Sequence, residues 1–245
     1  MRRLVNSILI GIVSGLTFAS PAEAQLGGWS MSVNAEAGLN IPVRQLGKNV
    51  GTFLGQEGNL QIVAERESSP LVGGGLTFQS PSGETLLRAR FVTTIDGELT
   101  GQVGVCEVPD TQFEGLPFCQ PVKNSADIRA FSIDAGFLQG SPGDAVRASL
   151  HLGVGVRQFS FGSLPCIGNE SWEPVCEATA EIWEDDGGLS AFLLAGLRLN
   201  GELGPATLWV EGIDRVGRYN GGSDRADGNI QNDVSITAGL ALRIF

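Results

Sequence analysis

The chain has 245 residues, of which 42% are hydrophobic and 18% are charged, and its formal net charge at pH 7 is −11. This apolar content excludes a disordered chain, and the 35 glycines follow no collagen repeat. The negative charge argues against binding to nucleic acid, so we expect no nucleic-acid partner.

The first 24 residues have the three-part layout of a secretory signal peptide. Arg2 and Arg3 precede an apolar stretch at 4–18, which the small-residue site Ala22-Glu23-Ala24 follows. We therefore expect cleavage before Gln25 and one exported domain at 25–245. No later run of about 20 apolar residues predicts a transmembrane helix.

Beyond the signal peptide, apolar and polar residues alternate over stretches of about ten positions, which is typical of strands with one apolar face. The clearest stretch places Leu150 and Leu152 on one face and Arg147 and Ser149 on the other. The least clear is the Gly-rich stretch at 71–79. The eight predicted strands lie, in chain order, at 29–40, 71–79, 85–95, 128–137, 145–161, 189–200, 205–214 and 233–244.

The connections between these strands alternate in length. Short turns rich in Gly, Pro and Ser lie at 80–83, 140–143 and 201–204, whereas long segments follow the first, third, fifth and seventh strands. Structureless loops of that length are unusual in a soluble domain. We predict an all-β fold: a closed, up-and-down antiparallel transmembrane barrel of eight strands, with short periplasmic turns and long extracellular loops.

A bilayer offers no partner to an unpaired backbone group, so the outside of a closed barrel must be apolar and the charged strand residues must face the lumen. An eight-stranded barrel is just wide enough for side chains to fill it, and we expect a blocked lumen. Arg129 is the one charge expected on an outward face, at the rim. The predicted lumen network consists of Glu36, Arg88, Arg90, Asp134, Arg147, His151, Arg157, Arg198, Glu211 and Arg243, and Asp233 has the same orientation.

Four cysteines in an exported chain predict two disulfides. Cys106 and Cys119 share one long segment and Cys166 and Cys176 another, so the local pairing is the simplest of three connectivities. Each bridge would add about 3 kcal/mol of stability in the chain-entropy model. A cysteine metal site is disfavoured because His151 is the only histidine, and we expect no metal and no cofactor.

An acidic cluster lies in the segment that contains the second cysteine pair. Its carboxylates could bind Ca²⁺, but they lack the compact spacing of a calcium loop, and a solvated loop is the favoured interpretation. The cluster consists of Glu170, Glu173, Glu177, Glu181, Glu184, Asp185 and Asp186.

The signal peptide, the opening strand at 31–39, the four hairpins and the terminal strand at 238–245 together resemble the small single-domain outer-membrane β-barrel proteins of bacteria with two membranes. This resemblance implies an outer-membrane location and contact with outer-membrane lipid. It also implies insertion by the barrel-insertion machinery, for which Phe245 would be the assembly signal.

We expect a noncatalytic barrel whose disulfide-braced loops stabilise the envelope or bind an extracellular ligand. Two alternatives stay open. The first is a lipid-modifying hydrolase built on Ser149 and His151, because some lipid A deacylase barrels use His, Ser and an acid. The second is a secreted soluble barrel that turns its apolar faces inward to bind an apolar ligand.

Overall fold

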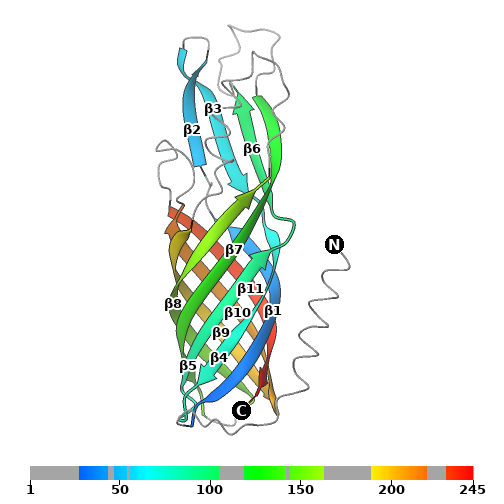
Figure 1. Ribbon diagram of the computed structural model, residues 1–245, viewed down its shortest axis with the longest axis vertical. Helices are drawn as coiled ribbons and strands as arrows, with labels where there is room; N and C mark the ends of the chain where they lie inside the picture. The colour runs from blue at the N-terminus through cyan, green and yellow to red at the C-terminus, as the bar shows by residue number, and fades with distance from the viewer. Residues whose placement is uncertain are drawn as a thin grey trace.

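A computed structural model describes residues 28–43, 47–53, 56–104, 119–141, 144–162, 189–219 and 230–244 (Figure 1). None of these residues belongs to a helix long and apolar enough to cross a membrane. The strands are β1 (Ser30–Pro42), β2 (Gly47–Phe53), β3 (Gln56–Arg66), β4 (Ser69–Gln79), β5 (Thr85–Thr94), β6 (Glu98–Gly104), β7 (Cys119–Gln139), β8 (Val146–Phe161), β9 (Ser190–Leu203), β10 (Ala206–Arg218) and β11 (Ile230–Arg243).

Eight of these strands close into a barrel, which confirms the predicted fold class. β1, β4, β5, β7, β8, β9, β10 and β11 follow one another around the wall in chain order, each antiparallel to its neighbours. The pairing of β11 with β1 completes the circle. The Gly-rich stretch at 71–79 is a wall strand, β4.

The register of the wall fixes the size of the barrel. The strand partners that start from Ser32 on β1 return to β1 at Pro42, ten residues further along. The intermediate partners are Thr77, Arg88, Asp134, Gly153, Leu194, Arg215 and Asp233. Eight strands with this stagger imply a tilt of about 40° and a backbone radius of roughly 8 Å.

The two faces of the wall differ sharply in chemistry. Leu150, Leu152 and Val154 are 51%, 55% and 58% exposed on the outside, whereas Arg147 and His151 on the same strand are buried inside. The other wall strands have the same orientation. This arrangement does not fit a soluble barrel with apolar faces turned inward, and it suits a wall surrounded by acyl chains.

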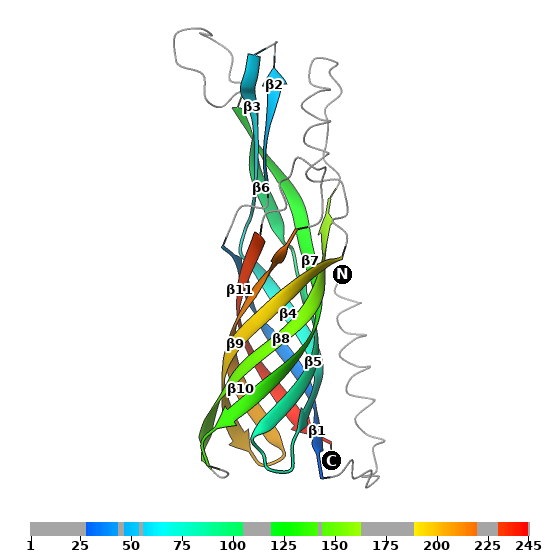
Figure 2. The same ribbon diagram turned by 90° about the vertical axis from the view of Figure 1, so that its left-hand side faces the viewer.

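The first two long connections contain strands, which differs from the expectation of structureless loops. β2, β3, β6 and the first part of β7 form a four-stranded sheet, here called the extension, that stands beyond the barrel rim at the end away from the short turns (Figures 1 and 2). Within β7, Cys119–Ser125 pairs with β6 and Ala126–Gln139 pairs with β8. Lys123 Nζ also donates to Glu98 Oε1 at 2.8 Å, and this hydrogen bond raises the pKa of Lys123.

Candidate functional site

Arg88 is the centre of a buried ion network in the lower half of the lumen. Its Nε donates to Asp134 Oδ1 on β7 and its Nη2 to Glu211 Oε1 on β10, each at 2.7 Å. Arg88 and Asp134 are direct cross-strand partners, so the alternation that turns both side chains inward also brings them together. The guanidinium therefore forms ion pairs with two buried carboxylates at once.

Arg90, two residues further along β5, extends this network to β1. It binds Glu36 in a two-pronged contact whose Nε–Oε1 distance is 3.0 Å, and its Nη1 lies 3.2 Å from Glu211 Oε2. The planar guanidinium suits this geometry. Side chains from β1, β5, β7 and β10 are thus linked across the barrel.

Ser149, His151 and Asp134 form a hydrogen-bonded chain beside the ion network. Ser149 Oγ lies 2.8 Å from His151 Nε2, and His151 Nδ1 lies 3.0 Å from Asp134 Oδ1. The histidine ring packs over Gly136, its cross-strand partner, where a Cβ atom would lie 2.2 Å from His151 Cε1. A glycine on β7 is therefore what makes room for this ring. Ser149 and His151 are both 0% exposed.

An apolar layer crosses the lumen above the ion network. It is formed by Leu71, Val92, Ala130, Phe192, Leu194 and Ile213, which come from five wall strands. Phe192 and Leu194 lie on the otherwise polar inner face of β9, and each is less than 5% exposed. Arg215 and Ser235, the cross-strand partners of Leu194 and Ile213, are buried beside this layer, so polar groups occupy the rest of its level in the lumen.

A second ion cluster lies above the apolar layer. Arg157 Nη1 donates to Asp233 Oδ2 at 2.5 Å, and Arg66, at the end of β3, contacts Oδ1 of the same carboxylate. The ring of Phe159 lies 5.1 Å from the Arg66 guanidinium and 5.2 Å from that of Arg157. The extension is thus held to the barrel by a side chain as well as by β7.

Two buried lumen arginines, Arg66 and Arg215, are not among the predicted network residues. Arg66 lies in a segment expected to be a loop, where no alternation was recognised. Arg215 lies one residue past the expected end of its strand, and β10 continues to Arg218. The sequence contains a signal for Arg215, because positions 211, 213 and 215 continue the alternation that turns every second residue of β10 inward. Arg215 is buried and donates through Nη1 to Ser235 Oγ at 2.8 Å.

The structure places Arg243 differently from the other predicted network residues. It is exposed at the turn end of β11, at the mouth of a small pocket, because it is the last residue of its strand and lies below the filled part of the lumen. Arg147 pairs with Glu202 at the same end. Arg198 lies just above, with Nε 2.6 Å from Asn200 Oδ1 and its guanidinium 4.2 Å from the centre of the Trp209 ring.

Several predicted features fall outside the described residues. They are the signal peptide, Cys106, Cys166, Cys176, the acidic cluster and Phe245, and the side chain of Cys119 belongs with them. The register does place Gly104, two residues before Cys106, opposite Cys119. In the part of the chain that is described, no group of three or more His, Cys, Asp or Glu side chains is arranged to hold a metal ion.

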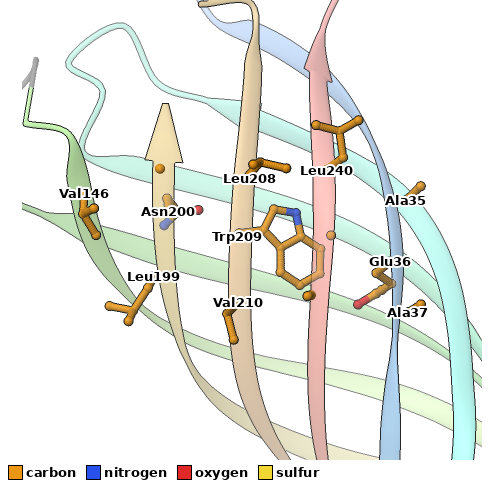
Figure 3. A pocket seen from close by; sticks show the side chains of 13 residues that line it. Ala35, Glu36, Ala37, Val146, Leu199, Asn200, Leu208, Trp209, Val210 and Leu240 are labelled. Atoms are coloured by element: carbon orange, nitrogen blue, oxygen red, sulfur yellow. The ribbon is translucent and has the colours of Figure 1, made fainter. Parts of the chain in front are cut away.

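The outer face of the wall has a shallow groove of about 790 Å³ over β1, β10 and β11 (Figure 3). Its floor contains the small residues Ala35, Ala37 and Ala238, and Leu208 and Leu240 are among the larger side chains that line it. The Trp209 ring packs inside the wall against Gly239, where a Cβ atom would lie 2.3 Å from Cζ2. The surface of this groove is almost entirely apolar, which suits lipid chains.

Comparison with known proteins finds similar folds at low sequence identity. No protein-family model and no curated protein sequence matches the chain. The outer membrane protein OprG from Pseudomonas aeruginosa is 14% identical at a TM-score of 0.47, over 87% of this chain and 95% of that chain. Neisserial surface protein A is 9% identical at a TM-score of 0.41, over 88% of this chain and 96% of that chain. The outer membrane protease OmpT from Escherichia coli is 11% identical at a TM-score of 0.40, over 88% of this chain and 95% of that chain.

Proposed function

Because the chain folds as a closed eight-stranded outer-membrane barrel, we propose that it is a noncatalytic and nonconducting anchor for a surface-exposed β-sheet. The barrel fixes the extension in the outer membrane. The extension, braced by the predicted disulfides, binds a ligand at the cell surface or stabilises the envelope. Insertion requires the barrel-insertion machinery, with Phe245 as its signal.

The continuity of β7 is the observation that carries this proposal. One strand of 21 residues belongs both to the barrel wall and to the extension, so the hydrogen bonds of one sheet run directly into the other. The contact of Arg66 with Asp233 adds a second attachment. A sheet held in this way is pre-organised, and binding to a rigid surface loses less conformational entropy than binding to a mobile loop.

Epitope insertion tests which side of the membrane carries the extension. A short tag between Phe53 and Gln56, where β2 and β3 join, should be labelled by antibody on intact cells. The matched control is the same tag at 142–143, in the short turn between β7 and β8, which should be labelled only after permeabilisation. Labelling of the control on intact cells, or of the first tag only in permeabilised cells, would contradict the proposal.

Conductance measurements test the closed lumen. The ion network and the apolar layer bury many side chains inside the described barrel, so we expect no stable channel from the purified protein in a planar bilayer. A large porin reconstituted in the same bilayers serves as the positive control. Steady unitary currents that scale with the amount of inserted protein would show that the lumen conducts.

A lipid-modifying hydrolase is the second candidate, and one observation favours it. Ser149, His151 and Asp134 have the order and the hydrogen bonds of a nucleophile, a base and an orienting acid. Their surroundings favour a structural role. The chain is sealed inside the barrel, Asn200 Nδ2 lies 3.2 Å from Ser149 Oγ, and Asp134 Oδ1 also accepts a hydrogen bond from Arg88. A substrate carbonyl in the bilayer would have to cross the wall to reach the hydroxyl.

A further inference from the structure

The turn end of the lumen contains a small polar pocket that the proposed function does not use. It has a volume of about 40 Å³, and residues at the turn ends of β4, β8, β9 and β11 contribute to its lining. Exposed Arg243 and half-exposed Glu202 stand at its mouth, so the pocket opens to the side of the short turns. Trp209 and the Ser149–His151 chain lie above it.

Positive charge dominates this pocket. Three arginines line it, Arg147, Arg198 and Arg243, against one carboxylate, that of Glu202. Arg147 pairs with Glu202, but its Nε is buried without a hydrogen-bond partner. The pocket therefore has two guanidinium charges that no carboxylate in its lining balances.

Arg198 is the most deeply buried of these cations. It is 3% exposed, and no carboxylate among the described residues lies within ion-pair distance of it. Its direct contacts are the amide oxygen of Asn200 and the face of Trp209, both uncharged, and the carboxylate of its cross-strand partner Glu211 is taken by Arg88 and Arg90. A guanidinium removed from water inside a wall surrounded by lipid is costly unless a counter-charge approaches it.

The remaining lining supplies neutral hydrogen-bonding groups. Thr77 Oγ1 accepts a hydrogen bond from Asn34 Nδ2 at 2.6 Å, which leaves the hydroxyl hydrogen of Thr77 free to donate. Ser32 and Thr207 add two more hydroxyl groups. Guanidinium groups combined with hydroxyl donors match the several acceptor oxygens of a phosphate better than they match a spherical halide.

We propose that this pocket binds inorganic phosphate from the periplasmic side. A cavity needs about 10–15 Å³ to hold one water molecule. A pocket of about 40 Å³ therefore has room for a compact tetrahedral oxyanion but not for a sugar or a nucleoside. The closed wall separates it from lipid headgroups. The proposal does not depend on what the extension does, because the site lies at the opposite end of the barrel.

Phosphate titration with tryptophan fluorescence as the readout tests the proposal, because the Trp209 ring packs on Arg198. Sodium phosphate added to the refolded full-length barrel in a zwitterionic detergent, at constant ionic strength set with chloride, should give a saturable change. Calorimetry under the same conditions should give the same midpoint. In Trp209→Phe the fluorescence change should disappear while the heat of binding remains.

Three substitutions show whether the signal comes from this pocket. Arg198→Gln should weaken phosphate binding about tenfold or more, because it removes a charge-assisted contact. Glu202→Gln should tighten binding several-fold, because it removes the only carboxylate and releases Arg147. The matched control, Arg215→Gln, removes another buried arginine that has no ion-pair partner among the described residues and does not line the pocket, and it should leave the midpoint unchanged.

Two results would overturn the proposal. One is a titration that does not saturate or that chloride reproduces at equal ionic strength. The other is equal weakening in Arg198→Gln and Arg215→Gln. If Arg198→Gln fails to fold, Glu202→Gln decides the question, since this carboxylate is partly exposed and a gain in affinity cannot arise from misfolding.

Discussion

Substitution of Arg88 by Met should destabilise the barrel by about 3–5 kcal/mol, the largest effect that we expect from a single lumen residue. The change removes the guanidinium that serves both Asp134 and Glu211. It leaves Asp134 with only its contact to His151 and Glu211 with only the longer contact to Arg90. Reversible urea unfolding in lipid vesicles, followed by tryptophan fluorescence, measures this loss.

Two further variants identify the cause of the loss. Arg129→Met removes a charge from the outer face near the rim, where the side chain is exposed, and should change stability by less than about 0.5 kcal/mol. Combining Arg88→Met with Asp134→Asn and Glu211→Gln should recover much of the stability, because the two carboxylates that Arg88 paired with then carry no charge. Equal stabilities for Arg88→Met and Arg129→Met would disprove a central ion network.

Substitution of Leu152 by Arg should cost about 2–4 kcal/mol when the protein is folded in lipid vesicles. Leu152 is 55% exposed on the outer face of β8, and the register places it near the middle of the apolar band. A guanidinium there must leave water for the hydrocarbon core. Urea unfolding of the variant against the unaltered protein, in vesicles of one lipid composition, gives the difference.

Val146→Arg is the matched control on the same strand and the same outer face. Val146 is 63% exposed, and its six-residue separation from Leu152 corresponds to a vertical distance of about 15 Å for strands tilted by about 40°. An arginine at that depth should cost only about 0–1 kcal/mol, because it reaches the interface. If Leu152→Arg and Val146→Arg both lower the free energy of unfolding by the same small amount, the outer face does not contact hydrocarbon.

The strands of the barrel wall could be predicted because the membrane imposes a strict pattern on them. Each wall strand borders lipid on one side and a polar lumen on the other, so its residues alternate, and even Gly-rich β4 was recognised. The strands of the extension lie beyond the barrel rim, where this pattern is not imposed. β2, with the sequence Gly-Lys-Asn-Val-Gly-Thr-Phe, has no continuous apolar face, and its place is decided by backbone pairing with β3. Period-two alternation is a weak signal for such a strand.

The inward orientation of the charged residues followed from the sequence, but their partners did not. Alternation assigns a side chain to a face and says nothing of its height in the lumen. Heights depend on the stagger of ten residues around the wall, which places Glu36 beside Arg90 and Asp134 within reach of His151. The same stagger leaves Arg198 without a carboxylate at ion-pair distance among the described residues, and it places Arg66 next to Asp233.

The sequence by itself determined the number of wall strands, their direction and the face that each residue occupies, because lipid and lumen act on every residue through local period-two geometry. Only the tertiary structure decided which cations meet which anions, where apolar side chains gather inside the lumen and how far β7 extends beyond the rim. These features depend on closure of the sheet, which sets distances between residues far apart in the chain, and no local pattern encodes such distances.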